Sequence, residues 1–381
     1  MSTWVGSEPV ALDRCAGRSR GPCRTVASRR SLPQVTRLRS TFLLLALAFA
    51  CAGANVREAP AAGEVGEIAF FSDRAGGGDL YVMNGDGTGT RRLTRGSAVR
   101  DSKFDPLSTI GLEAPQWSPG GSQILFASER GDVLFVVDVD SRRQRRLASN
   151  AVTADWSPDG KTIAFAKGRG DAVDLWVMRA DGSQQRRLTK NGWWPDWSPD
   201  GKTIAFLRFR GGVAFEGVED LWLMRADGSQ QRRLTKNAWS PDWSPDGASV
   251  LFMKSGKGGP DIYLTRVRGG GERVLVRSGE SPAWSPDGKQ IAYVGEHGSS
   301  DIAVIGVDGT RQAWLTADSA GDSSPAWSPD GKRIAFANDL TFTREYLEGE
   351  EIFVMEIDGS GRRRLTDNKA NDLAPAWKPA P

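Results

Sequence analysis

The sequence predicts an all-β protein built from one repeated unit, and three observations lead to that prediction. The string W-S-P-D-G, or a near variant, begins at Trp117, Trp156, Trp197, Trp243, Trp284, Trp327 and, in a degenerate copy, Trp377. Successive copies are 39, 41, 46, 41, 43 and 50 residues apart. The chain of 381 residues also contains 45 glycines and 14 tryptophans, which is typical of short strands, tight turns and large core side chains. A strand-rich repeat with a period in the forties indicates the four-stranded blade of a β-propeller.

One unit, taken in order, shows how each strand arises. Trp156 lies in a short first strand, and the next four residues have the preferences of a type I turn, with Pro second and Gly last. Residues 162–166 alternate as a second strand and residues 175–178 form a third. An Asp-Gly pair then signals a hairpin, and residues 186–189 form the outer strand. The two arginines of that strand are typical of a protected sheet edge.

The number of units predicts how the ring closes. The pattern of second, third and fourth strands occurs seven times, first over residues 68–94 and last over residues 334–366. No W-S-P strand precedes the first copy, whereas a spare one at Trp377 follows the last. We therefore predict seven blades over residues 64–379, with six or eight as alternatives. The C-terminal strand at Trp377 would complete the first blade and remove an exposed edge.

These motifs resemble the PD40 repeat of TolB-like propellers, which is similar to the WD40 repeat. The matching residues are the W-S-P-D-G strings, the I-A-F strands, the D-L or D-I strands followed by D-G, and the R-R-L-T strands. The resemblance implies a propeller for nearly everything after residue 64. TolB proteins also carry an N-terminal α/β domain and usually have six blades, and neither feature is predicted for this chain.

A basic leader is predicted over residues 1–54. Arginines precede the apolar run TFLLLALAFA, and small residues follow it, which is the plan of a secretory signal. The run is shorter than the roughly 20 residues of a spanning helix. Two processing routes stay open: ordinary cleavage at Ala48-Phe49-Ala50, or lipidation of Cys51 in a lipobox. Residues 55–63 would be a linker. We expect an exported protein, periplasmic or at the cell surface. If Cys51 is lipidated, that anchor would be its only membrane attachment.

Charge and composition narrow the choice of partners. The net charge of +3 and the pI of 8.8 invite an acidic partner. Residues 1–50, however, hold eight arginines against two acids, so the remainder carries a net charge of −3. We therefore expect no nucleic-acid partner. No cysteine follows Cys51, which argues against disulfides in the propeller. His297 is the single histidine, which argues against a His-based metal site. No cofactor is expected, a divalent cation near the channel mouth being the alternative.

Residues that interrupt the repeat are the candidates for function. In a propeller, the connections between blades and the loops between second and third strands share one face. The candidate binding residues on that face are Trp193, Trp194, Trp239, Arg208, Arg210, Phe215, Arg344 and Tyr346. Exposed aromatic side chains beside charges mark recognition surfaces. Asp322 and Asp372 each stand five residues before a repeat tryptophan. They could hold a hard cation at the channel mouth, or remain solvated loop acids.

Two classes of function follow from these residues. The first is a monomeric binding or scaffold module for a protein, a peptide or a cell-envelope glycan. The alternative is an enzyme, a polysaccharide lyase or hydrolase that acts at the channel mouth. With His297 alone, and without the separate hydrolase domain of the prolyl oligopeptidase class, whose propellers this chain resembles, the sequence argues against catalysis. Carboxylates converging with His297 in a deep pocket would favour an enzyme, and a broad aromatic rim would favour binding.

Overall fold

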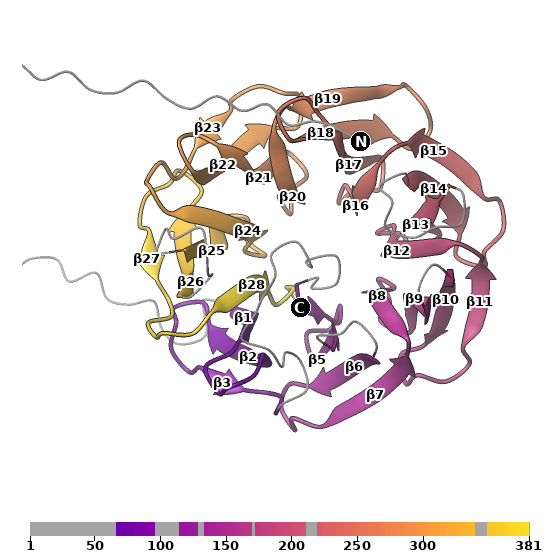
Figure 1. Ribbon diagram of the computed structural model, residues 1–381, viewed down its shortest axis with the longest axis horizontal. Helices are drawn as coiled ribbons and strands as arrows, with labels where there is room; N and C mark the ends of the chain where they lie inside the picture. The colour runs from indigo at the N-terminus through magenta and orange to yellow at the C-terminus, as the bar shows by residue number, and fades with distance from the viewer. Residues whose placement is uncertain are drawn as a thin grey trace, which may run out of the picture. The chain divides into compact units, whose positions relative to one another are not determined.

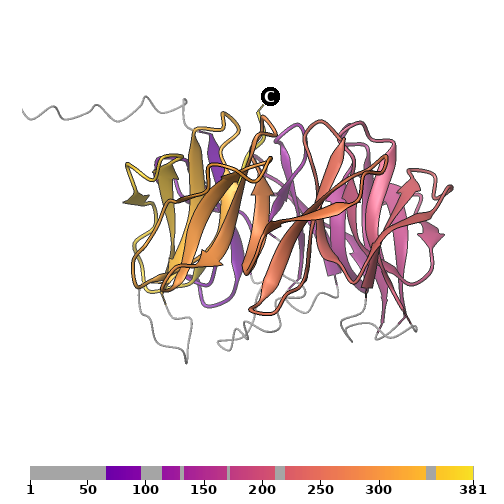
Figure 2. The same ribbon diagram turned by 90° about the horizontal axis from the view of Figure 1, so that it is seen from above.

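The computed structural model describes residues 66–95, 114–128, 133–169, 172–210, 219–339 and 349–380. In these ranges every regular element is a β-strand, and the strands form seven four-stranded antiparallel sheets. Figures 1 and 2 show the sheets standing around a central opening as the blades of a ring. The prediction of an all-β, seven-bladed propeller is therefore confirmed. The described residues contain no helix with the length and hydropathy that a membrane crossing requires.

Each blade takes one strand at each of four radial positions (Figure 1). From blade 1 to blade 7, the innermost strands are β28 (Asp372–Trp377), β4 (Gln116–Trp117), β8 (Ala151–Trp156), β12 (Gly192–Trp197), β16 (Trp239–Trp243), β20 (Gly279–Trp284) and β24 (Gly321–Trp327). The second strands are β1 (Glu67–Ser72), β5 (Gln123–Ala127), β9 (Thr162–Arg169), β13 (Thr203–Phe209), β17 (Ser249–Ser255), β21 (Gln290–Glu296) and β25 (Arg333–Asp339).

The two remaining rings complete the sheets. The third strands are β2 (Asp79–Asn84), β6 (Val133–Asp138), β10 (Ala172–Arg179), β14 (Glu219–Arg225), β18 (Pro260–Arg266), β22 (Ser300–Gly306) and β26 (Glu350–Glu356). The outermost strands are β3 (Arg91–Arg92), β7 (Gln144–Ser149), β11 (Arg186–Thr189), β15 (Arg232–Lys236), β19 (Glu272–Val276), β23 (Ala313–Trp314) and β27 (Arg363–Arg364).

The ring closes as the sequence predicts. The C-terminal strand β28 is hydrogen-bonded to β1, with Ile68 opposite Trp377 and Ser72 opposite Asp372. Blade 1 is therefore assembled from both ends of the propeller, and no innermost edge is left open there. The predicted boundaries of leader, linker and propeller, at residues 54 and 64, lie outside the described residues, as does Cys51.

The antiparallel pairing gives the ring two distinct faces. The connections between blades and the loops between second and third strands share one face, which we call the loop face. The W-S-P-D-G turns and the Asp-Gly hairpins share the other, which we call the turn face. On the turn face, Ser157 Oγ donates to Asp159 Oδ1 at 2.6 Å and accepts from the backbone N–H of Thr162. Gly160 closes the turn at a φ of 66°. Asp159 therefore stabilises a turn, as the motif predicts.

The repeat tryptophans pack between blades. Six of these seven side chains are buried, at 5–8% exposure, and Trp284 is half-buried. Where the indole N–H has a partner, that partner is the innermost strand of the preceding blade, as in Trp243 to Asp196 O at 3.1 Å and Trp327 to Ala283 O at 3.0 Å. Burying an aromatic side chain removes about 150–250 Å² from water, so one tryptophan per blade secures each boundary.

The two arginines of the R-R-L-T strands also make contacts that hold the blades together. The second arginine pairs with an acid on the third strand of its own blade, for example Arg92 with Asp79 at 2.5 Å. The first arginine crosses to a hairpin carbonyl of the next blade, for example Arg186 to Asp227 O at 3.2 Å. Arg363 makes this contact across the ring closure, to Gly85 O at 3.1 Å. The edge arginines therefore join neighbouring blades as well as protecting the edge.

Candidate functional site

Those candidate residues of the loop face that the structure describes do not form one aromatic rim. Phe215, Arg344 and Tyr346 lie outside the described residues. The other candidates divide into a group on blades 4 and 5 and a pair of acids on blades 7 and 1.

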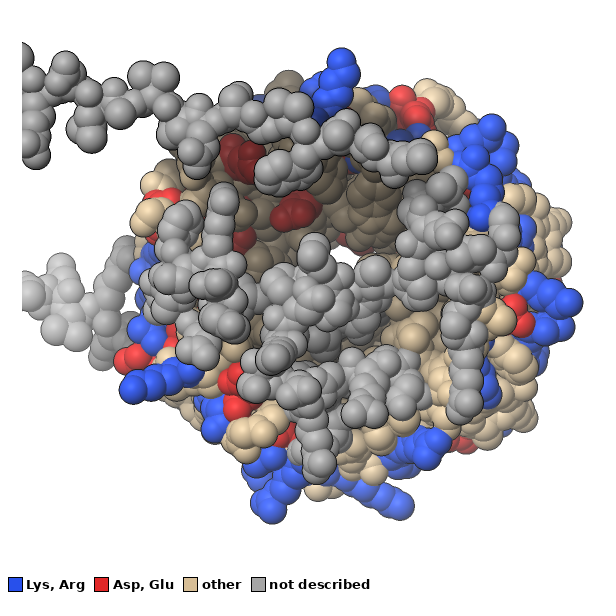
Figure 3. Space-filling view, in the orientation of Figure 1, with Lys and Arg blue, Asp and Glu red and all other residues tan. Residues whose placement is uncertain are grey.

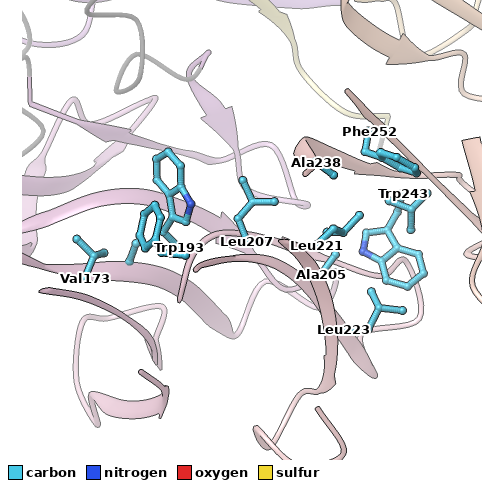
Figure 4. Close-up of a cluster of buried hydrophobic side chains, with 12 residues drawn as sticks. Val173, Trp193, Ala205, Leu207, Leu221, Leu223, Ala238, Trp243 and Phe252 are labelled. Atoms are coloured by element: carbon cyan, nitrogen blue, oxygen red, sulfur yellow. The ribbon is translucent and has the colours of Figure 1, made fainter. Parts of the chain in front are cut away.

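Trp193 is a core residue, and the prediction that it is exposed on a loop is wrong. It lies in β12 at 5% exposure, and its ring stacks on Phe209 at 5.2 Å between centroids. Figure 4 shows it among buried side chains from blades 3, 4 and 5, near Val173 and Leu207. The connection from β11 is shorter than the sequence pattern suggested, because β12 already begins at Gly192. At least one of the extra tryptophans of blade 4 is therefore part of the core.

Trp194 and Trp239 are half-buried at the innermost strands. Trp194 meets Trp193 edge to face, with centroids 5.4 Å apart, and its backbone N–H donates to Thr153 Oγ1 at 3.1 Å. Its φ of 50° is left-handed, in the bulge that precedes Pro195. Trp239 packs against the core clusters of blades 4 and 5. Each tryptophan therefore keeps only part of its ring available to a partner.

The sequence predicts Arg208 in the loop that follows the second strand of blade 4, whereas Arg208 lies within that strand, β13. Its guanidinium lies 4.3 Å from the centroid of Trp222 and donates to Thr189 Oγ1 at 2.7 Å. Burial lowers the pKa of Arg208 from its ordinary value. Arg210 is exposed and pairs with the buried Asp220 at 3.0 Å. Arg208 thus has partners on blade 4 and on the neighbouring blade 3, and Arg210 has one on its own blade.

Asp322 and Asp372 are buried strand residues, with 1% and 0% exposure, and are not solvated loop acids. Asp372 pairs with Arg74 at 2.6 Å, and Asp322 lies 3.7 Å from Arg362 and accepts from Asn338 Nδ2 at 2.6 Å. Burial raises the pKa of Asp322, against the opposing effect of its hydrogen bonds and Arg362. Each acid therefore serves as the counter-ion of an arginine that covers an aromatic pair of its blade.

Two acids that the sequence analysis did not single out lie on blade 6. Glu280 in β20 and Glu296 at the end of β21 are both exposed on the loop face. The charge of Glu296 adds to burial in raising the pKa of Glu280. Neither acid has a hydrogen bond or an ion pair to another described residue. Figure 3, which looks onto the loop face, shows acidic side chains in the hollow over β20 and β21. Glu280 and Glu296 are therefore a negative patch to which no described cation is bound.

The sequence contained a signal for that patch in the second strand of blade 6. In the strand register, Lys167 and Arg208 stand opposite the first residues of β8 and β12, whereas Gly295 stands opposite Gly279 in β20. The ring of Trp314 takes the space of the missing side chain, since a Cβ added at Gly295 would lie 2.9 Å from its Cη2. Blade 6 thus lacks the cation that blades 3 and 4 place there.

Three further acids line the innermost strands and were also missed. Asp155, Asp196 and Asp242 precede the repeat tryptophans of blades 3, 4 and 5, where blades 6, 7 and 1 have alanine. Asp155 Oδ2 accepts the backbone N–H of Trp197 at 2.7 Å. Burial raises the pKa of Asp155 and of Asp242 to about 7. The position directly before each W-S-P string could have revealed them.

The geometry for catalysis is not assembled around His297. Its exposed ring stacks on Trp314 at 4.9 Å between centroids, and no carboxylate is hydrogen-bonded to it among the described residues. Over the same part of the chain, no three His, Cys, Asp or Glu side chains are grouped as metal ligands. The described loop face therefore offers charge and partly exposed indoles for contact.

Solved structures share the fold at low sequence identity. Puromycin hydrolase aligns with 17% identity and a TM-score of 0.62, over 80% of this chain but 53% of its own, so this chain spans about half of that enzyme. An oligogalacturonate lyase in complex with manganese aligns with 16% identity and a TM-score of 0.58, over 76% of this chain and 85% of its own. TolB from Acinetobacter baumannii aligns with 20% identity and a TM-score of 0.49, over 80% and 79%. The similarities to puromycin hydrolase and the oligogalacturonate lyase establish the fold alone.

A comparison with curated proteins finds no match. The family model described as the TolB beta propeller domain, PD40, matches residues 102–216, 240–341 and 281–380. These ranges cover more than half of the chain and include all seven W-S-P strings and the R-R-L-T strands at residues 186–189 and 363–366. The chain therefore belongs to the TolB β-propeller (PD40) family.

Proposed function

We propose that this chain is an exported, monomeric binding module that holds a cationic segment of a protein or peptide partner against its loop face. One observation carries the proposal: Glu280 and Glu296, on neighbouring strands of blade 6, form an exposed acidic pair on that face, with no cation bound to either among the described residues. Two like charges raise each other's energy, so a positively charged group that enters the hollow relieves their repulsion.

The neighbouring blades support this assignment by contrast. In blades 3, 4 and 5 the loop-face end of the second strand carries Lys167, Arg208 and Lys254, each over an aromatic ring. Blade 6 has Gly295 there, and Trp314 fills the space. A cation supplied by a partner would therefore take, in blade 6, the place that a lysine or arginine side chain takes in blades 3, 4 and 5.

Export is proposed from the leader. The basic segment, the apolar run and the small residues around Cys51 form a secretory signal plan. Removal of residues 1–50 leaves a chain with a net charge of −3, in agreement with attraction of a cationic partner. An enzyme remains the second class of function, and an envelope glycan the second class of ligand, and the experiment below distinguishes both.

The test is direct binding of the purified chain to synthetic probes. A Lys- and Arg-rich peptide, an acidic peptide of equal length and a neutral cell-wall oligosaccharide are titrated at low and high salt. We expect the cationic peptide alone to bind, and its affinity to fall with salt. The double variant Glu280→Lys, Glu296→Lys should weaken that binding by about tenfold or more, which corresponds to about 1.4 kcal/mol.

The matched control reverses two exposed acids elsewhere, Asp140→Lys and Glu356→Lys, which leaves net charge equal to that of the test variant. It should bind like the unaltered chain. Equal loss in both double variants would mean that only net charge matters, and the site assignment would then be wrong. Binding or turnover of the oligosaccharide would instead favour the glycan or enzyme assignment.

A further inference from the structure

An acidic residue stands at the loop-face end of the third strand in every blade except blade 2, where Val133 takes its place. The strand pairing makes these acids equivalent, and they are Asp79, Asp174, Asp220, Asp261, Asp301 and Glu351. Asp301, the member in blade 6, is fully buried at 0% exposure. A carboxylate removed from water in this way requires an opposite charge or strong hydrogen bonds.

In the other five blades that carry the acid, an arginine of the same blade supplies the opposite charge. The ion pairs are Arg92–Asp79 at 2.5 Å, Arg187–Asp174 at 3.0 Å, Arg233–Asp220 at 3.2 Å, Arg277–Asp261 at 3.2 Å and Arg364–Glu351 at 2.7 Å. In blade 5 the usual arginine position holds Val274, and Arg277, three residues further along, pairs with the acid instead. The acid therefore keeps a cation even where the repeat arginine is lost.

Blade 6 lacks both of these arginines. Trp314 takes the usual position, and its ring fills the space beside Gly295. Ala317 takes the position that Arg277 has in blade 5. Among the described residues, no lysine or arginine is paired with Asp301, whose partners are two hydroxyl groups. Its charge is therefore not balanced by a side chain of the described chain.

The two hydroxyl contacts of Asp301 do not replace the arginine. Thr316 Oγ1 donates to Asp301 Oδ1 at 3.3 Å, and Ser299 Oγ lies 3.2 Å from Asp301 Oδ2. Blade 1 has the same threonine contact, from Thr94 to Asp79 at 3.1 Å, and has its ion pair in addition. The missing cation is thus what distinguishes blade 6.

Three oxygen atoms come together where that cation is missing. Ser299 Oγ lies 2.6 Å from the backbone oxygen of Asp318 as well as 3.2 Å from Asp301 Oδ2. A serine hydroxyl has one proton, so it can donate fully to one of these two acceptors and not to both. Oxygens that share a Ca²⁺ ion lie about 2.3–2.6 Å from it and therefore about 3–3.5 Å from one another. The spacing of the three oxygens is close to that arrangement.

We propose that Asp301 Oδ2, Ser299 Oγ and the backbone oxygen of Asp318 bind one hard metal cation, Na⁺ or Ca²⁺, in place of the arginine that the other acidic blades supply. Carboxylate, hydroxyl and carbonyl oxygens are the donors that hard cations prefer. Ser299 is half-buried and Ser300 is exposed, so water completes the coordination from the loop face. The site uses neither Glu280 nor Glu296 and is independent of the proposed partner site.

The experiment measures thermal unfolding of the purified chain in metal-free buffer of constant ionic strength. NaCl or CaCl₂ is exchanged against the chloride of a large organic cation. We expect one of the two metal ions to raise Tm with saturation, by about 2 °C or more at a hundredfold excess over Kd. Asp301→Asn should abolish the rise. In metal-free buffer it should be no less stable than the unaltered chain, because it removes an unbalanced buried charge.

A second variant supplies the cation from the chain itself. Ala317 is exposed, and Ala317→Arg copies the arrangement in which Arg277 pairs with Asp261 at 3.2 Å. This variant should gain stability in metal-free buffer and lose the response to the metal ion. The matched control is Asp308→Asn, an exposed acid on the turn face of the same blade, which should keep the full response.

Absence of a saturable rise with either metal ion would overturn the proposal, as would a rise that survives in Asp301→Asn. If Asp301→Asn does not fold, calorimetric titration with NaCl and CaCl₂ decides between the unaltered chain and Ala317→Arg. One ion should bind to the unaltered chain and none to the arginine variant. Equal binding to both would place the ion elsewhere and overturn the assignment to Asp301.

Discussion

Arg74 and Asp372 are 298 residues apart in the sequence, and their side chains form an ion pair of 2.6 Å across the ring closure. Asp372 is fully buried, and the Arg74 guanidinium lies 4.8 Å from the centroid of Tyr81. On the turn face, Lys378 pairs with Glu67 at 2.7 Å. The first and last strands of the propeller are thus joined by a buried pair on one face and a half-exposed pair on the other.

The two pairs should differ in their contribution to stability. Asp372→Ala leaves Arg74 beside a buried space without its counter-ion, and breaking such a pair costs about 3–5 kcal/mol. The lower end is expected because a quarter of the Arg74 side chain is exposed. Lys378→Ala should cost about 1 kcal/mol or less, as for other solvent-exposed pairs. Urea unfolding of both variants tests this difference, and equal losses would show that the buried pair does not secure the closure.

The position of Asp372 and Asp322 in the repeat carries glycine or alanine in blades 3 to 6, which leads to a second prediction. A Cβ added at Gly279 would lie 2.8 Å from Val276 Cγ1 and 3.2 Å from Ile262 Cδ1. Gly279→Ala should therefore cost about 1–3 kcal/mol by overpacking. Gly321→Ala is the control, because no described heavy atom lies within 4 Å of its added Cβ. A Gly279 variant as stable as the control would contradict the tight packing of this boundary.

Trp193 and Trp194 are adjacent but should respond differently to truncation. Trp193 is buried at 5% exposure, so Trp193→Ala should cost about 3–5 kcal/mol, the usual range for a large core aromatic. Trp194 is only half-buried, and Trp194→Ala should cost about half as much or less, in proportion to the apolar area it loses. Thermal and urea unfolding of the two variants measure the difference. Equal costs would place both rings in the core.

The sequence was sufficient for the fold because the repeat is local. Spacing, turn residues and the spare strand at Trp377 each follow from neighbours in the chain, and they predict seven blades and closure of the ring by the C-terminal strand. The exposure of Trp193 does not follow from local pattern, because whether a ring near a connection is buried depends on the adjacent blade. The burial of Asp322 depends in the same way on Arg362, which lies 40 residues further along the chain.

Five acids that the sequence did not mark as candidates show a second limit of prediction from sequence. Asp155, Asp196 and Asp242 look like ordinary polar residues beside a tryptophan, and only the ring places them in succession along the channel wall. Glu280 and Glu296 become a patch because Gly295 and Trp314 take the place of the cation that blades 3, 4 and 5 have there. Such differences between blades are visible only when residues at equivalent positions of the strand register are compared.

Glu350 is a buried acid whose ionisation can be tested by itself. It begins β26 opposite Asp339, at 8% exposure, and burial together with the charge of Asp339 raises the pKa of Glu350 to about 7. An unfolded glutamate has a pKa of about 4.3. Because the folded pKa is the higher one, the folded chain loses stability as the pH rises between these two values and stays less stable above them. Glu350→Gln should remove that loss, so the variant should gain stability over the unaltered chain at pH 8 relative to pH 4. Urea midpoints at the two pH values measure the change, and a pH-independent difference between the chains would contradict the ionisation of Glu350 as its cause.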